Sequence, residues 1–296
     1  MNSIMQLIMN SLQIGAVYVL FALGLTLVFG VMKVVNFTHG EFYTLGAFVT
    51  YLFLQEWDLP GRLNNNLFVS YIFTFLIAIV IIGILALLIE KVIFSPFRGD
   101  MISGLIISLG LSMVVQIVLL IFLGTSPKKV PTIFPGTSNI LGGMISNERI
   151  VIFIIALLLT IILYLVIQKT KLGKAMRAIT QDREAAELQG INYKYISAWG
   201  FTIGAVLAAI AGVLVAPASV VEPYIGSEYL MKAFIIIILG GLGSIAGCIL
   251  AGFLLGFIES FGAYYFDLAY ASILSFVIVM IILILRPQGL MGHGSK

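Results

Sequence analysis

The motif NFTHGE places an amide, an imidazole and a carboxylate within six residues, at Asn36, His39 and Glu41. It stands beside a long apolar stretch, and ionisable groups at membrane depth are costly and tend to serve a function. One interpretation is that the three side chains line or gate a pathway. The alternative is structural: Asn36 caps a helix that enters at Phe42, and His39 and Glu41 lie in its first turn. No nucleophile stands nearby, so the motif does not indicate an enzyme.

Further polar side chains lie in or beside apolar sequence. Glu259 is deep in an apolar helix, where it either pairs with a basic group such as Lys232 or makes a polar contact between subunits. Tyr224 and Lys232 fall in the segment VEPYIGSEYLMK before a short apolar stretch, and with Glu259 they are further pathway candidates. Gln116 lies inside another apolar stretch and is predicted to make an interhelical hydrogen bond.

The composition argues against metal or nucleotide chemistry in this chain. One cysteine, Cys248, and two histidines are too few for a His/Cys metal cluster. The phosphate-binding pattern G-x-x-x-x-G-K-[ST] does not occur, so any ATP that drives the protein is bound by another chain. The net charge of +3 gives no indication of nucleic-acid binding. We therefore expect no cofactor and no metal on this chain.

The elements that position these residues are membrane-spanning helices. The chain has 296 residues, 61% hydrophobic and only 10% charged, so a soluble domain of this length could not cover itself. Two short or glycine-broken stretches, 42–54 and 229–241, add to the long ones and give eight or nine transmembrane or re-entrant helices. The fold class is therefore all-α and polytopic. The seven long stretches are 12–29, 68–89, 102–123, 150–167, 196–216, 245–261 and 271–285.

Basic residues in the short loops set the orientation. Residues 90–100 and 169–194 are rich in Lys and Arg and are separated by two spans, so both face one side, expected to be the cytoplasm. Residues 125–149 then face outside, where their Pro and Gly content suits a structured loop. The two broken stretches fall one in each half, an arrangement that points to a substrate pathway at a repeat interface.

Residues 169–194 form a charged, helix-forming loop. Apolar residues recur at helical spacing between 172 and 179. Two short helices would then project an apolar knob rimmed with charge, suited to a partner groove. The alternative is an amphipathic segment on the lipid surface, which the mixed charges oppose. Asp182 is placed to cap the second helix, Glu184 lies in its first turn and Gly190 ends it. The candidates for partner contact are Gly173, Arg177, Asp182, Glu184 and Gly190.

Six ordered motifs make the sequence resemble the permease subunits of bacterial branched-chain amino-acid ABC importers. They are NFTHGEFYTLGAF, EKVIFSPFR, GKAMRAITQDREAAELQGIN, EPYIGSEYLMKAF, GGLGSIAG and RPQGL, and they span almost the whole chain. The resemblance implies a single transmembrane permease domain, 1–296, with a coupling loop at 169–194, in the bacterial inner membrane. In the family, the loop matching 173–192 seats in a groove of the ATPase.

The resemblance also implies an assembly. Its other members would be a second, homologous permease subunit, two ATPase subunits that use the ATP, and a periplasmic binding protein that delivers branched-chain or hydrophobic amino acids. The motifs do not select the substrate, because importers of urea and short amides share this permease type. The residues leave another alternative, a stand-alone proton-coupled secondary transporter with His39 and Glu41 as a proton relay.

Overall fold

The protein is built almost entirely of helices. The computed structural model describes residues 2–63, 65–140, 143–266, 268–286 and 288–291. The longer helices are α1 (Asn2–Met32), α2 (His39–Tyr51), α4 (Leu67–Ile89), α5 (Met101–Leu123), α6 (Asn147–Lys169), α7 (Lys171–Gln181), α9 (Tyr193–Val215), α10 (Ile225–Gly240), α11 (Ile245–Tyr265) and α12 (Leu268–Leu285). The short ones are α3 (Leu59–Arg62), α8 (Arg183–Leu188), η1 (Leu52–Glu56), η2 (Glu90–Phe94), η3 (Ser95–Phe97) and η4 (Ala216–Ala218).

Several of the longer helices are long and apolar enough to cross a membrane. Six in the described part of the chain meet that description, α1, α4, α5, α6, α9 and α11, and α12 contains a shorter apolar helix, Tyr270–Leu285. Each of the seven long predicted stretches lies in one of these helices. The two short predicted stretches lie in α2, continued by η1, and in α10. The prediction of an all-α polytopic membrane protein is confirmed.

Helices α1 and α9 form the centre of the bundle. Inside the molecule, 89% of the apolar window of α1 and 83% of that of α9 are buried, against 17% for α5 at the periphery. Small residues allow the central pair to touch, because a Cβ atom added at Gly24 would lie 2.6 Å from the carbonyl oxygen of Gly204, and the reverse distance is also 2.6 Å. Close approach at small residues is the usual basis of helix packing in membranes.

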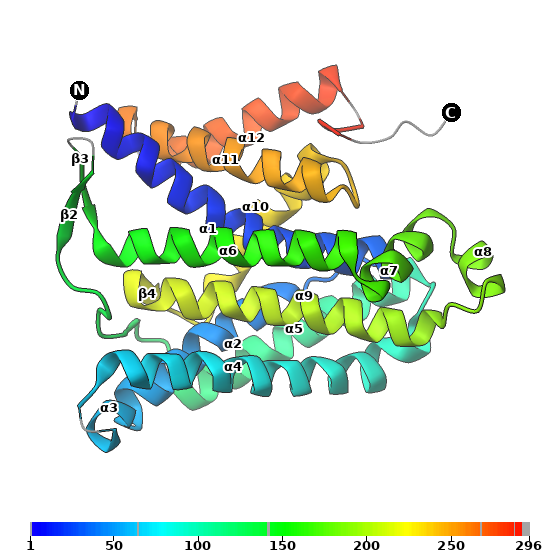
Figure 1. Ribbon diagram of the computed structural model, residues 1–296, viewed down its shortest axis with the longest axis horizontal. Helices are drawn as coiled ribbons and strands as arrows, with labels where there is room; N and C mark the ends of the chain where they lie inside the picture. Colours follow the sequence, from blue (N-terminus) through cyan, green and yellow to red (C-terminus); the bar gives the residue numbers. More distant parts are fainter. Residues whose placement is uncertain (1, 64, 141–142, 267, 287, 292–296) are drawn as a thin grey trace.

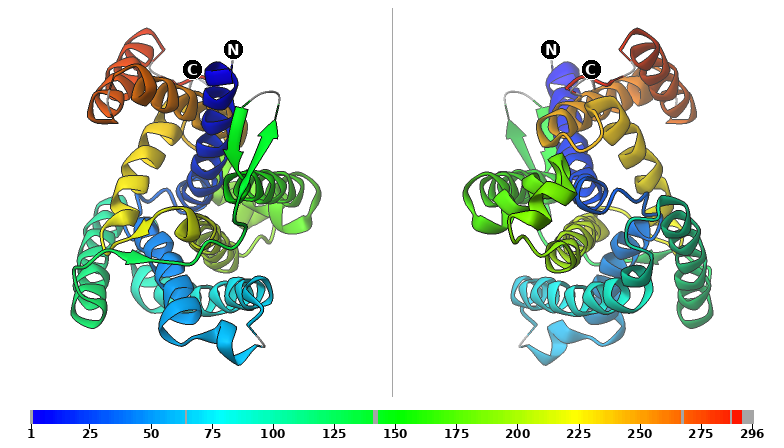
Figure 2. Two further views of the ribbon diagram at one scale, coloured as in Figure 1. Left: turned by 90° about the vertical axis from the view of Figure 1, so that its left-hand side faces the viewer. Right: turned by 90° about the vertical axis from the view of Figure 1, so that its right-hand side faces the viewer.

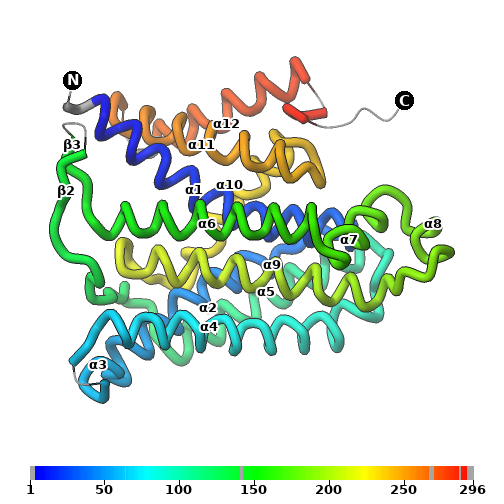
Figure 3. The backbone as a smooth tube through the Cα atoms, viewed as in Figure 1, coloured from blue at the N-terminus to red at the C-terminus, as the bar shows by residue number. Residues whose placement is uncertain are grey.

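The two half-helices α2 and α10 meet at their N-termini. A Cβ atom on Gly226 would lie 1.9 Å from the carbonyl oxygen of Gly40, so both positions require glycine. The amide of Gly226 donates to the Thr44 hydroxyl at 3.1 Å. This bond gives a partner to an amide in the first turn of α10, where no intrahelical acceptor exists. From this junction the two half-helices run toward opposite ends of the bundle (Figure 1 and Figure 3). The pair α1–α2 therefore runs through the bundle in the opposite direction to the pair α9–α10 (Figure 1 and Figure 3).

The two ends of the bundle differ (Figure 1 and Figure 2). One, the strand end, carries the start of α1, α3 and two small antiparallel sheets, in which β1 (Lys128–Lys129) pairs with β4 (Val220–Val221) and β2 (Thr137–Ile140) with β3 (Gly143–Ser146). The other, the α8 end, carries α7, α8 and the connection between α4 and α5. The two basic loops therefore share one end and the predicted outer loop lies at the other, as the charge pattern indicated.

We predict that Gly226→Ala destabilises the protein. The new methyl group would collide with the Gly40 carbonyl, and overpacking of this kind costs about 1–3 kcal/mol. The matched control is Gly110→Ala in α5, where a Cβ atom meets nothing within 4 Å and where alanine is expected to be neutral or stabilising by about 0.5–1 kcal/mol. Melting temperatures of the two variants in detergent check this, and equal values would contradict the close junction.

Candidate functional site

His39 and Glu41 occupy the first turn of α2, as the structural alternative predicted, and both are buried. The His39 ring faces α1, where Nε2 donates to the carbonyl oxygen of Phe21 at 3.1 Å. The Glu41 carboxylate faces α5 instead, where Oε1 accepts from Ser112 at 2.8 Å and from Gln116 at 2.7 Å. These hydrogen bonds direct the two side chains to different helices and do not link them into a proton relay.

Gln116 makes the interhelical hydrogen bond that the sequence predicted, and it connects three helices. Its Nε2 lies on α5 and donates both to Glu41 on α2 and, at 3.0 Å, to the hydroxyl of Ser227 on α10. The first turns of both half-helices are thereby tied to α5. Sequence reasoning missed Ser112 and Ser227, since isolated serines in apolar helices carry no signal of their partner.

Asn36 does not cap α2, so that prediction is wrong. The helix begins at His39 with Thr38 in the capping position and no side-chain bond there. Asn36 Oδ1 instead accepts from the Thr38 amide at 3.1 Å, inside the connection between α1 and α2. Ser108 on α5 holds the same connection, because its hydroxyl accepts from the Phe37 amide at 3.1 Å. No side chain therefore caps the start of α2.

The three pathway candidates of the NFTHGE motif share one feature. Each keeps a buried polar atom that has no hydrogen-bond partner among the described residues: Asn36 Nδ2, His39 Nδ1 and Glu41 Oε2. A buried polar atom without a partner is costly and calls for an explanation. The role of these residues in a pathway stays a prediction, and their free atoms are consistent with it.

A buried ion pair joins α10 to α11. Lys232 Nζ lies 2.5 Å from Glu259 Oε1, which confirms the pairing predicted for this carboxylate. Tyr18 on α1 completes the cluster, because its hydroxyl accepts from Lys232 at 2.8 Å and donates to Glu259. Lys232 also lies 2.9 Å from Glu228, four residues earlier on α10. The cluster therefore connects three helices inside the bundle.

Tyr224 does not belong to this cluster. It immediately precedes α10 and is 53% exposed, whereas Lys232 and Glu259 are largely buried. The sequence analysis grouped them because Tyr224 and Lys232 lie in or near a broken apolar stretch and Glu259 is a charged residue deep in an apolar helix. The structure separates them because α10 begins at Ile225 and carries Lys232 two turns into the bundle.

Two cavities share Glu259 in their walls. The α1 cavity, of about 410 Å³, is lined by Leu7, Asn10, Gln13, Ile14, Val17, Tyr18, Arg149, Tyr229, Glu259, Ser260, Ala263 and Tyr264. The α12 cavity, of about 260 Å³, is lined by Glu228, Met231, Lys232, Ile235, Leu255, Glu259, Ser272, Ser275 and Phe276. The ion pair thus lies at the boundary of two spaces large enough for small molecules.

No metal site is evident in the ranges that the structure describes. Cys248 is a buried free thiol on α11. No group of three His, Cys, Asp or Glu side chains among the described residues could hold a metal ion. The absence of a cofactor on this chain stays an expectation from the sequence.

At the α8 end, the apolar face of α7 packs on the bundle. Met176 and Ile179 are each 2% exposed, so the prediction that this face forms a projecting knob is wrong. Gly173 allows the approach, since a Cβ atom there would lie 2.2 Å from the Ile167 carbonyl oxygen. Arg177 donates to that same oxygen at 2.5 Å and so caps the last turn of α6. Gly173 and Arg177 hold α7 against α6.

Helix α8 is the element that projects, as Figure 1 shows. Asp182 caps it as predicted, accepting from the Ala185 amide at 3.0 Å. Gly190 follows the helix with φ +81°, a conformation that favours glycine. Glu184 is exposed in the first turn, and Leu188, which sequence reasoning missed, is 87% exposed at its end. The apolar group available to a partner is therefore on α8 and not on α7.

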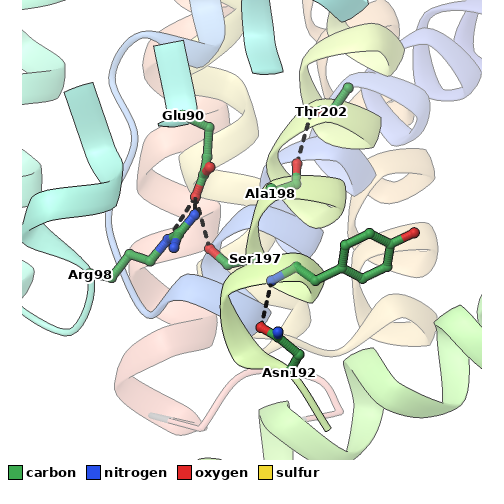
Figure 4. Close-up of polar contacts among 7 residues, drawn as sticks. Glu90, Arg98, Asn192, Ser197, Ala198 and Thr202 are labelled. Carbon is green, nitrogen blue, oxygen red and sulfur yellow. Dashed lines mark hydrogen bonds and ion pairs between the residues drawn. The ribbon is translucent and has the colours of Figure 1, made fainter. Parts of the chain in front are cut away.

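A second buried ion pair lies behind α8. Glu90, the first residue of η2, pairs with Arg98, and the Ser197 hydroxyl on α9 donates to the same carboxylate oxygen at 3.3 Å. Figure 4 shows the three side chains pointing toward one another. Arg183 on α8 stacks over the Tyr193 ring at the start of α9, 3.8 Å from its centroid. α8 therefore contacts α9. The bond from Ser197 to Glu90 in turn holds α9 to the connection between α4 and α5.

These features define a polytopic helical membrane protein with two half-helices that meet inside the bundle, a buried ion pair beside two cavities and a projecting helix at one end. Residues 7–283 match the family described as "Branched-chain amino acid transport system / permease component". The chain therefore belongs to this permease family.

Individual relatives cover nearly the whole chain. The sequence is 34% identical to the high-affinity branched-chain amino acid transport system permease protein BraD of Pseudomonas aeruginosa and 33% identical to LivH of Escherichia coli K12, each over 98% of this chain and 96% of the relative. It is 27% identical to the permease protein LivM of Escherichia coli K12, over 93% of this chain and 68% of that protein. No solved structure matches.

We predict that Arg98→Met destabilises the protein, because it leaves Glu90 buried without its cation. Removing one partner of a buried pair costs about 3–5 kcal/mol, and the double variant with Glu90→Gln should recover much of this loss. The control is Glu187→Gln, which removes the exposed Arg183–Glu187 pair and should cost only about 0–1 kcal/mol. Thermal melts in detergent measure all three, and a double variant no better than Arg98→Met would contradict the pairing.

Proposed function

We propose that this chain is the permease subunit of an ATP-driven importer of branched-chain amino acids in the bacterial inner membrane. The family match and the relatives named as branched-chain amino acid permeases support the substrate class. The observation that carries the mechanism is the projecting helix α8, whose exposed Leu188 stands among charged side chains. The chain would translocate substrate and carry out no catalytic step itself.

Helix α8 would couple the permease to the ATPase. Leu188 is an apolar anchor of the kind that enters a partner groove, and Glu184 lies on the same exposed helix. Gly173, Arg177, Asp182 and Gly190 would contribute by shaping the α7–α8 pair and not by touching the partner. Such coupling requires that the ATPase bind α8 differently in its two states. Two ATPase subunits would use ATP that this chain does not bind.

A second, homologous permease subunit would complete the membrane part of the assembly. The similarity of this chain to both LivH and LivM supports a heteromeric pair. The half-helix α10 supports it too. Its Glu228 side chain is 67% exposed in this single chain, and contact between a charged group and lipid is costly, so a second subunit is the better contact. A periplasmic binding protein would approach the strand end and deliver the substrate.

Other functions receive less support. Import of urea or short amides by the same permease type is not what the relatives' names indicate. A stand-alone proton-coupled secondary transporter would need His39 and Glu41 to exchange a proton, and their hydrogen bonds lead to α1 and α5 respectively.

We predict that Leu188→Asp weakens association with the ATPase while membrane insertion and the melting temperature stay unchanged. Loss of an apolar anchor typically costs about 2 kcal/mol, or roughly 30-fold in affinity. Leu188→Met is the matched control, because it keeps an apolar side chain of similar size at the same exposed position. Co-purification of the ATPase in mild detergent measures the effect, and undiminished recovery with Leu188→Asp would remove α8 as the coupling element.

A further inference from the structure

One ammonium group serves two carboxyl groups in the ion-pair cluster. Lys232 lies 2.5 Å from Glu259 and 2.9 Å from Glu228. The Glu259 side chain is 9% exposed, whereas that of Glu228 is 67% exposed. Tyr18, which contacts both Lys232 and Glu259, places the buried carboxyl group about half-way along α1. A second cation at Glu259 would therefore leave Lys232 with Glu228 and keep every buried charge paired.

The α1 cavity gives a cation access to this cluster. Glu259 lines it, and the cavity of about 410 Å³ exceeds the size of a leucine molecule. Ile14 and Val17 line it as well and offer an apolar surface. Arg149, at the start of α6 and toward the strand end, also lines it and donates to Asn10 at 3.2 Å. The cavity thus combines a cation, a buried carboxyl group and an apolar wall.

This combination matches a zwitterion with an apolar side chain. We propose that Glu259 binds the ammonium group of an α-amino acid that enters the α1 cavity, and that this group takes the place of Lys232 on Glu259. Lys232 keeps Glu228 as its partner, because the two residues are four apart on α10. The substrate class rests on the proposed function, which it deepens by giving the permease a substrate site of its own.

The exchange of partners has a structural consequence. In the structure, Lys232 holds the half-helix α10 to Glu259 on α11 and to Tyr18 on α1. When the substrate ammonium occupies Glu259, these ties are released while the pair within α10 remains. Amino-acid binding then favours the state in which α10 is free to move, because the ligand binds that state better.

The first test compares ligands on the wild-type chain. The permease is purified with its partner subunits but without the binding protein, and binding of radiolabelled L-leucine is measured. Unlabelled leucine should compete. 4-Methylpentanoate, which lacks the ammonium group, and urea should compete at least about 10-fold less well, since neither makes the hydrogen bond between an ammonium and the Glu259 carboxylate. Equal competition by 4-methylpentanoate, or no leucine binding by the wild-type complex, would overturn the proposal.

The second test changes the carboxylate. Glu259→Gln should lower leucine affinity by about 10- to 100-fold. The matched control is Glu222→Gln, the same change at an exposed carboxylate that does not line the α1 cavity, and it should leave the affinity unchanged. Unaltered affinity in Glu259→Gln would contradict the site. If that variant fails to fold, the ligand comparison on the wild-type chain still decides.

The outcomes separate this site from the proposed function. A complex that contains ATPase subunits and imports leucine, yet shows no ammonium-dependent binding, would keep the function and refute the site. A chain that never co-purifies with an ATPase would refute the proposed function, whatever it binds.

Discussion

A helix that begins inside a membrane leaves backbone amides without intrahelical partners, and lipid offers none. Helices α2 and α10 both begin this way, and their N-termini lie against each other. Gly40 and Gly226 allow the contact, and the Thr44 hydroxyl accepts the amide of Gly226. The long helices must surround this junction to keep lipid away, which explains why α1 and α9 are the most buried of the six candidate spans.

Polar side chains around the junction serve as ties between particular helices. Glu41 and Gln116 bind α2 and α10 to α5, whereas Lys232 and Glu259 bind α10 to α11. At the α8 end, the Glu90–Arg98 pair fixes the connection behind the projecting helix. Apolar packing holds the half-helices as well, since Phe42 of α2 and Ile236 of α10 are buried in the core. The fold therefore combines half-helices tied to their neighbours inside the bundle with a projecting helix at the α8 end (Figure 1).

The sequence predicted the spans and the two breaks well, because lipid demands long apolar stretches and glycine interrupts them visibly. It also predicted the Lys232–Glu259 pair, since a lone charge in an apolar helix needs a partner. It could not predict that Ser108 and Ser112 on α5 hold the NFTHGE region, because helix rotation and neighbours are set by packing. The error at α7 has the same origin: an amphipathic face looks identical whether it covers a partner or, like Met176, its own bundle.

We infer that ATP hydrolysis by partner subunits drives amino-acid import through this chain. Its most direct test is uptake of radiolabelled leucine by proteoliposomes that hold this permease, its homologous partner and the two ATPases, with the binding protein outside. We expect uptake that requires ATP inside and persists when a protonophore removes the proton gradient. Uptake that continues without ATP and collapses with the proton gradient would contradict it.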